Sequence, residues 1–290
     1  MKKKKLFENI IHGIFLILGT ITVGFVLVIT IYLIVSGIPA IAQIGLFNFL
    51  FGQEWASTAA EPKFGILPFI LSSVYGMAGA IVIGVPIGFF TAVFLSKVAN
   101  KKVRAAVGVA VDLLAGIPSV VYGLVGMLVL VPGIRILFKL PDGASLLAAI
   151  IVLAVMILPN IIKMSMTALD AVPKEYEDSS LALGATATET YFRVSVPAAK
   201  SGIAAAVVLG VGRAIGETMA VIMVAGNVAN MPTLFGSVRF LTTAVASEMS
   251  YSSPGSLQRN ALFSIALVLF LFIMLINATL NFLLKRDKEK

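Results

Sequence analysis

Four ionisable side chains interrupt long apolar segments of this sequence: Asp112, Lys163, Arg213 and Glu217. A charge in the middle of a bilayer costs roughly 3 kcal/mol or more, so it usually faces the interior of a helix bundle and marks a pathway. Arg213 and Glu217 are four residues apart, which on one helix places them on the same face, one turn apart. This spacing predicts a substrate route through a helix bundle. The alternative is a static ion pair that fixes helix packing.

The composition indicates a membrane protein with several spans. Hydrophobic residues make up 59% of the 290 residues and charged residues only 12%, and the mean hydropathy is +1.03. The absence of cysteine excludes thiolate metal sites, disulfides and thiol catalysis. A net charge of +8 would suggest nucleic acid in a soluble protein. Here the basic residues flank apolar segments, so membrane orientation explains them and no nucleic-acid partner is expected.

Six apolar stretches are long enough to cross a bilayer, for which a helix needs about 20 residues. Lys and Arg favour alternate connecting segments, 15 against 5, so both termini are expected in the cytoplasm. The predicted fold is an all-α polytopic membrane protein with six transmembrane helices. We expect a first helix and outer loop in 1–65, a transmembrane domain in 66–284 and a cytoplasmic tail in 285–290. The spans are predicted at about 12–36, 66–95, 105–131, 146–169, 201–226 and 259–284.

Small residues recur at intervals of four in the second predicted span, as Gly76, Ala80, Gly84 and Gly88. Such a stripe allows two helices to approach closely in lipid. Gly212 and Gly216 repeat the pattern in the fifth span, so both spans are expected to pack closely against neighbours.

The outer loop at about 37–65 is rich in aromatic residues. Trp55, Phe47, Phe49 and Phe51 all lie in it, and aromatic side chains favour the membrane–water interface. The loop is therefore predicted to rest on the outer leaflet, with a plain loop carrying aromatic anchors as the alternative.

The inner loop at about 170–200 has the signals of two short helices. Pro173 suits the start of a helix and Gly184 suits its end. Thr186 and Glu189 then form a capping-box pattern that begins a second helix. A segment that only connects two spans would not need this structure, so the loop is expected to dock a soluble partner.

Catalytic motifs are missing from the chain. The run Ala199–Lys200–Ser201 lacks the glycines of a phosphate-binding loop, so the chain is not expected to hydrolyse ATP. The only histidine, His12, lies near the start of the first span, which leaves no set for serine hydrolysis in the core. The chain is thus expected to be a transport subunit and not an enzyme, driven by an ion gradient or by a partner.

The inner loop resembles the EAA loop of ABC importer permeases. In that pattern Glu-Ala-Ala precedes a glycine by three residues, and nine residues separate the glycine from Ile-any-Leu-Pro. This sequence has DSS at 178–180, Gly184, and VSVP at 194–197. The resemblance implies a type I ABC importer permease fold in which the loop fits a groove on a separate ATPase. The residues implied in this coupling are Tyr176, Asp178, Ser179, Ser180, Leu181, Leu183 and Gly184.

Three further stretches resemble permeases of the phosphate-specific Pst importer, and the PstC type more than the PstA type. They are FGILPFI at 64–70, LLAGIPSVVYG at 113–123 and GRAIGETMAV at 212–221. The resemblance implies a heterodimer with a PstA-like permease, two PstB-like ATPases and an external PstS-like phosphate-binding protein. It also implies a bacterial inner-membrane location, with ATP and Mg²⁺ bound by the ATPase and no cofactor on this chain.

Phosphate is an anion and needs cationic donors, and arginine offers a planar fork that matches two phosphate oxygens. Arg213 is the one arginine expected in mid-span, and Glu217 would neutralise it when the site is empty. Asp112 could line the pathway or only make a structural hydrogen bond, and Lys163 could extend to the interface. The predicted pathway residues are Arg213, Glu217, Thr218, Asp112 and Asn227.

Other transport functions remain open. The same mechanism could carry another oxyanion such as sulfate or molybdate, and the chain could be the paired PstA-type subunit. A gradient-driven transporter would need no docking loop, and its frequent inverted repeats are not visible here. A second role in sensing phosphate is a further alternative, although the chain has no receiver or kinase domain.

Overall fold

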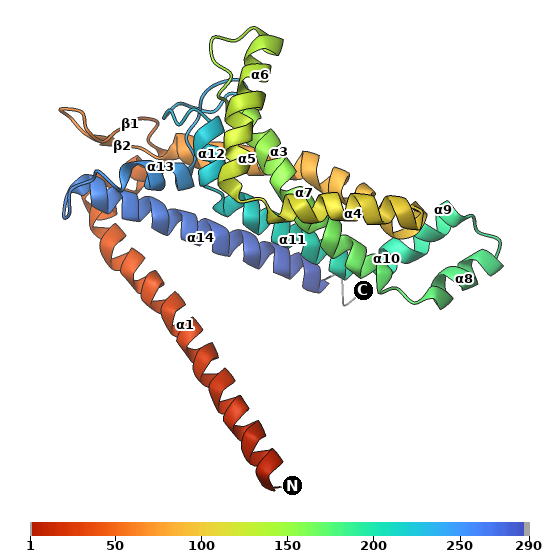
Figure 1. The fold of residues 1–290 in the computed structure, drawn as a ribbon. Coiled ribbons are helices and arrows are strands. Elements are labelled where there is room, and N and C mark those ends of the chain that lie inside the picture. Colours follow the sequence, from red (N-terminus) through yellow and green to blue (C-terminus); the bar gives the residue numbers. More distant parts are fainter. Residues whose placement is uncertain (1, 287–290) are drawn as a thin grey trace.

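The computed structural model describes residues 2–286, which are almost entirely helical (Figure 1). Three helices form the centre of the bundle: α3 (Leu67–Val93), α7 (Leu146–Asp170) and α11 (Lys200–Gly216). The main hydrophobic cluster lies along α7, which packs against both α3 and α11. The central position of α7 agrees with its sequence, because a helix that is apolar on all sides is buried.

Two further long helices flank this centre, α1 (Lys2–Ile44) and α14 (Leu257–Arg286). The C-terminal part of α1 packs on α14, where the Ser264 hydroxyl donates a hydrogen bond of 2.6 Å to the Gly37 carbonyl. Towards its N-terminus α1 diverges from the bundle (Figure 1). Its apolar surface from residue 11 onwards is therefore largely uncovered by this chain.

The bundle has two distinct ends. One end, here called the hairpin end, comprises residues 45–66 and 225–256, and the other, the loop end, comprises residues 94–104 and 170–200 (Figure 1). α3 connects the two ends, since it begins beside the hairpin and its C-terminus continues into the loop end.

The small-residue stripe of α3 is buried as predicted. A Cβ added at Gly84 would lie 2.7 Å from Ile157, and one at Gly88 would lie 2.8 Å from Ile161, both on α7. Ala80 has no exposed surface. The stripe thus brings α3 and α7 into close contact, and a larger side chain would force them apart.

Five described helices are long and apolar enough to cross a membrane, and a sixth span results if one bent pair is counted. The bent pair joins residues 187–198 to α11 at an angle of 71°. The predicted all-α fold with six spans is therefore confirmed, with one span bent at its entry. The predicted tail at 285–290 begins within α14, and residues 287–290 lie outside the described part of the chain.

The third predicted span, 105–131, is wrong as a single helix. The first helix of this region ends at Gly116, and Ile117 and Pro118 have extended backbone. Proline has no N–H to donate and disfavours helix in the residue before it, so the chain breaks here and turns sharply (Figure 1). The helix long enough to span is residues 119–138. The elements are α4 (Lys101–Gly116), α5 (Ser119–Val125), the π-helix η2 (Gly126–Leu130) and α6 (Val131–Phe138).

The fifth predicted span, 201–226, is also interrupted. α11 ends at Gly216, Glu217 is extended, and a short helix α12 (Met219–Val224) follows Thr218. The glycine favours this break, because it costs a helix about 1 kcal/mol relative to alanine. Arg213 and Glu217 therefore do not share one continuous helix, which corrects the spacing argument made from the sequence.

The hairpin end contains small elements packed over the start of α3. Strand β1 (Trp55–Ala56) pairs antiparallel with β2 (Lys63–Phe64), with Trp55 opposite Phe64. Helix α2 (Leu46–Phe51) precedes the hairpin, and α13 (Leu241–Glu248) packs beside it (Figure 1).

The loop end contains the two short helices that the sequence predicted. α8 (Lys174–Ala182) begins after Pro173, and α9 (Ala187–Thr190) begins at Thr186 with the predicted capping box to Glu189. Two further segments lead into α11: the π-helix η3 (Tyr191–Ser195) and α10 (Val196–Ala198).

Candidate functional site: an uncovered arginine on a membrane helix

One face of α11 is left open by the rest of the chain. Leu209, Gly212, Arg213 and Gly216 lie at positions i, i+3, i+4 and i+7, which is one helix face. Leu209 is 53% exposed, and a Cβ added at Gly212 or Gly216 would meet no atom within 4 Å. The prediction that these two glycines pack closely against a neighbour is therefore wrong within this chain. Their lack of side chains leaves the surroundings of Arg213 open.

Arg213 itself is half-buried and forms no hydrogen bond or ion pair with another described residue. Its charge lies within electrostatic reach of Tyr122 on α5. The Tyr122 hydroxyl donates a 2.7 Å hydrogen bond to the Leu114 carbonyl across the break between α4 and α5. The charge of Arg213 therefore lies near the corner between α4 and α5, and no described residue occupies its hydrogen-bond donors.

Glu217 does not pair with Arg213 among the described residues. Its Oε1 instead accepts a 3.1 Å hydrogen bond from the Ala220 N–H at the start of α12. Its carbonyl accepts a 3.0 Å bond from the Thr242 hydroxyl, and Thr218 bonds back to the Gly216 carbonyl at 3.3 Å. The predicted ion pair fails because the helix ends between the two residues.

Asp112 lies on α4, away from this group, and pairs with Lys163 on α7. Both side chains are well exposed, at 63% and 45%. Asp112 forms no hydrogen bond or ion pair with the other four predicted pathway residues in the described chain. The pair gives each charge a partner, as the structural alternative for Asp112 predicts.

Asn227 lies at the hairpin end in a left-handed conformation, with φ of 53°. Its carbonyl accepts a 3.0 Å hydrogen bond from Arg239 Nε, while its buried side-chain oxygen has no partner among the described residues. The structure therefore joins Asn227 to Arg239.

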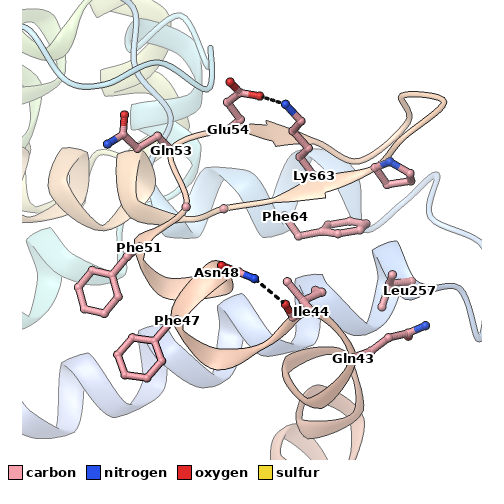
Figure 2. Close-up of a pocket in the computed structure, with 13 residues that line it drawn as sticks. Gln43, Ile44, Phe47, Asn48, Phe51, Gln53, Glu54, Lys63, Phe64 and Leu257 are labelled. Atoms are coloured by element: carbon pink, nitrogen blue, oxygen red, sulfur yellow. Dashed lines mark hydrogen bonds and ion pairs between the residues drawn. The ribbon is translucent and has the colours of Figure 1, made fainter.

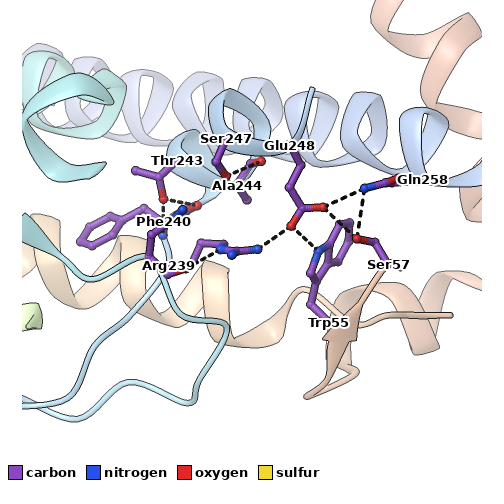
Figure 3. A network of polar contacts seen from close by, with 10 residues as sticks. Trp55, Ser57, Arg239, Phe240, Thr243, Ala244, Ser247, Glu248 and Gln258 are labelled. Carbon is purple, nitrogen blue, oxygen red and sulfur yellow. Dashed lines mark hydrogen bonds and ion pairs between the residues drawn. The ribbon is translucent and has the colours of Figure 1, made fainter. Parts of the chain in front are cut away.

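Arg239 belongs to a buried polar cluster centred on Glu248, here called the Glu248 hub (Figure 3). Glu248 is 4% exposed and accepts hydrogen bonds through both carboxylate oxygens. Oε1 binds Arg239 at 2.6 Å and the Trp55 indole N–H at 2.9 Å, while Oε2 binds Ser57 at 2.9 Å and Gln258 at 3.2 Å. The hub ties the hairpin, α13 and α14 together. Sequence reasoning missed it, because its members are up to about 200 residues apart.

Two hollows also lie on the surface of the described chain. One of about 900 Å³ lies between α2 and the hairpin, near the exposed ion pair of Glu54 and Lys63 (Figure 2). The other, of about 1020 Å³, lies along α5, α6 and α7 and is lined almost entirely by apolar side chains. An apolar lining offers no hydrogen-bond donors to an anion. The second hollow is therefore not an anion route, whatever its size and position.

At the loop end, the tip between α8 and α9 projects from the bundle (Figure 1). Leu183 is 90% exposed, Tyr176 is 55% exposed and Leu181 is 46% exposed. Gly184 has a φ of 88° with open space around it. Asp178 and Ser179 are also exposed, while Ser180 turns inward to bond Thr190 at 2.9 Å. Six of the seven predicted coupling residues are thus exposed.

Comparison with known proteins decides the family. Residues 84–287 match the family described as binding-protein-dependent transport system inner membrane component. The chain belongs to this family of ABC importer permeases. It is 42% identical to the probable ABC transporter permease protein YqgH of Bacillus subtilis, over 86% of this chain and 82% of that protein. It is 36% identical to the phosphate transport system permease protein PstC of Mesorhizobium japonicum, over 83% and 79% of the two chains.

Solved structures agree on the fold. The permease superposes on a chain of a bacterial alginate ABC transporter with a TM-score of 0.64 at 16% identity, covering 93% of this chain and 94% of that chain. It superposes on a chain of the inward-facing methionine ABC transporter MetNI with a TM-score of 0.60 at 20% identity, covering 77% and 97%. A permease of this family works in a membrane with a separate ATPase and a binding protein.

The permease also carries a polar cluster at its loop end that the sequence did not reveal. Glu177 on α8 forms an ion pair with Lys97, with 2.5 Å between Oε1 and Nζ. The same oxygen accepts a 2.8 Å hydrogen bond from the Ser195 hydroxyl. Burial raises the pKa of Glu177, but the bonds from Lys97 and Ser195 outweigh it, so the pKa lies below its usual value. Glu177 is therefore a carboxylate at neutral pH. The two partners are 80 residues apart in the sequence, so no local signal could predict the pair.

Proposed function

We propose that this permease imports inorganic phosphate. The observation that carries the proposal is Arg213, which has no charged partner among the described residues and lies on a face of α11 that these residues leave open. The relatives named PstC support the cargo, because the chain is 31–36% identical to several of them over most of its length.

In the proposed mechanism the guanidinium group of Arg213 offers two parallel N–H donors to a passing phosphate. The anion replaces water and supplies the negative charge that no described side chain supplies. Binding at such a site has to stay weak enough for release, as in any conduction pathway. Because the Glu217 carboxylate is bonded to the Ala220 N–H, it does not occupy the Arg213 donors, and in the proposal it serves as a further pathway residue. Thr218, Asn227 and Asp112 are the further pathway residues of the proposal.

The proposed assembly contains a PstA-like permease beside this chain, two PstB-like ATPases and a PstS-like phosphate-binding protein. ATP and Mg²⁺ are bound and used by the ATPases, so this chain carries no catalysis and no cofactor. The exposed tip at residues 176–184 supports the proposed ATPase contact, because its apolar side chains have no cover in this chain.

In the proposed orientation the loop end and both termini face the cytoplasm of a bacterial cell. α14 runs from the hairpin end towards the loop end, and α1 meets α14 near the hairpin (Figure 1). This arrangement supports the basic-residue count, since it sends both chain ends away from the hairpin. Segment 1–65 would then serve as an attachment to the transmembrane domain at 66–284.

The test is uptake of labelled phosphate by phosphate-starved cells that lack this chain, with sulfate measured in parallel. Restoring the chain is expected to restore phosphate uptake and leave sulfate uptake unchanged. Recovery of sulfate uptake alone would transfer the mechanism to a different oxyanion. Recovery of neither anion, with normal amounts of the chain in the membrane, would remove the cargo assignment.

A further inference from the structure

The polar cluster around Glu177 joins α8 to the end of α3. Lys97 Nζ lies 2.5 Å from Glu177 Oε1, and the two side chains are only 9% and 19% exposed. The fully buried Ser195 hydroxyl donates to the same oxygen at 2.8 Å. An ion pair this well shielded from solvent is screened far less by salt than an exposed one. It is therefore a firmer contact than a pair on the surface.

Both donors lie on irregular helix. Lys97 is in the π-helix η1 (Phe94–Val98), which continues α3, and Ser195 ends the π-helix η3. π-helical turns are rare in proteins overall. Where they do occur, they are often found at functional sites, where they redirect side chains. Here two such turns place Lys97 and Ser195, which are 98 residues apart in the sequence, so that both donate to one carboxylate oxygen.

The surroundings show what the contact connects. α8 has no buried residue, so it has little apolar packing of its own. The bonds from Ser180 to Thr190 and from Ser195 to Glu177 hold α8 to the α9–η3 segment. Lys97 is then the charged link from this unit to α3.

Other polar contacts at the loop end connect η1 and α4 to the end of α7. Ser96 donates to Asp170 at the end of α7 at 2.6 Å, and Arg104 pairs with the same carboxylate. α3 packs along α7 and reaches the Glu248 hub, where Arg239 lies 5.8 Å above the Phe69 ring. A displacement of α8 that reaches Lys97 is thus applied to the C-terminal end of α3, whose N-terminal end lies at the hub.

We propose that the Lys97–Glu177 ion pair, completed by Ser195, is the contact that carries movement of α8 to α3, and that it sets how much substrate is moved per ATP. Lys97 and Glu177 are positioning residues in this scheme and touch neither substrate nor nucleotide. The inference rests on the proposed ATPase contact of α8 and deepens it, and it does not depend on the proposed cargo.

The test uses the whole importer in proteoliposomes and measures anion transported per ATP hydrolysed. The chain has no cysteine, so Lys97→Cys with Glu177→Cys introduces the only two thiols of this subunit. Before cross-linking, the ratio is expected to fall about 5-fold or more, the usual scale of a coupling free energy. A flexible thiol cross-linker of matching length should then return the ratio to at least half of its value in the importer without substitutions. Both arms use the same folded protein.

The controls separate this inference from general damage and from the cargo assignment. Glu54→Gln breaks an exposed ion pair at the hairpin end and should leave the ratio unchanged. The anion is chosen by first measuring whether the unchanged importer transports phosphate or sulfate. An error in the proposed cargo is detected in that measurement. The comparison between the variants and the unchanged importer then uses the anion that is transported. An unchanged ratio in the double-cysteine protein would overturn the inference. A cross-link that fails to restore the ratio, or that stops ATP hydrolysis and transport together, would do the same.

Discussion

Two arginines of this permease, Arg213 and Arg239, are both half-buried but differ in their contacts. Arg239 pairs with Glu248 at 2.6 Å (Figure 3). It also donates to the Asn227 carbonyl at 3.0 Å and lies above the Phe69 ring. Arg213 has no hydrogen bond or ion pair with a described residue, and glycines flank it on an open helix face. One cation has a carboxylate partner within the chain, and the other has none among the described residues.

The difference indicates two roles for a charge that is costly to remove from water. A buried charge whose partners are all present holds elements together, and removing one partner leaves the other unpaired. A charge without partners has to be satisfied by water, by a partner chain or by substrate. The comparison therefore predicts that changes around Arg239 affect stability, and that changes at Arg213 affect transport.

The largest effect is expected from Arg213→Ala. Loss of the guanidinium removes charge-assisted hydrogen bonds to the anion, so phosphate uptake should fall about 10- to 100-fold. Since Arg213 has no partner in the described chain, the thermal midpoint of the purified importer should not fall. The measurement is labelled-phosphate uptake with the membrane level of the chain checked. Normal uptake by Arg213→Ala would end the comparison, because the open arginine would then have no function in transport.

A second prediction concerns Glu248→Ala, which leaves the Arg239 charge buried and unpaired. The cost should be about 3–5 kcal/mol, seen as a lower thermal midpoint and less importer in the membrane. Glu54→Gln is the matched control, because that pair is exposed and should cost at most about 1 kcal/mol. Replacing both Glu248 and Arg239 by Met should recover much of the stability. Equal midpoints for Glu248→Ala and the control would contradict the structural assignment of the hub.

Trp55→Phe tests a single bond within the hub. The change keeps an aromatic ring against Phe64 and Phe69 but removes the indole N–H that donates to Glu248 at 2.9 Å. A hydrogen bond to a charged group contributes about 1.5–3 kcal/mol, so the midpoint should fall less than in Glu248→Ala. In a Glu248→Ala background the same change should cost little, because the acceptor is already gone. Additive losses in the double variant would show that the ring, and not the bond, stabilises the hairpin.

Local signals of the sequence predicted the parts of the fold that depend on local chemistry. Apolar runs predicted the spans, the Thr186–Glu189 capping box predicted α9, and the α3 stripe predicted its packing on α7. The helix breaks at Ile117–Pro118 and at Gly216 were not predicted from the sequence, because the apolar runs continue through them. Hydropathy reports burial in lipid and is insensitive to a corner in the backbone.

Long-range polar contacts were beyond the sequence argument. Trp55 was assigned to the membrane interface with three phenylalanines, but it is 8% exposed inside the Glu248 hub, and Phe49 is fully buried. Only Phe47 and Phe51 are exposed, and they stack on one side of α2 (Figure 2). Arg213 was identified because a charge in an apolar run is visible locally. Its missing partner could be seen only once Glu217 was placed beyond the end of the helix.

The smallest effects are expected at two glycines that look alike in sequence. Gly84→Ala places a methyl group 2.7 Å from Ile157 and should cost about 1–3 kcal/mol through overpacking of α3 on α7. Gly212→Ala meets no atom of this chain within 4 Å, and alanine is the better helix former, so stability should rise by about 0.5–1 kcal/mol. Thermal midpoints of the purified importer measure both. A loss of stability in Gly212→Ala would mean that the partner permease covers this face in the assembly, and Arg213 would then lie in a subunit contact instead of an open route.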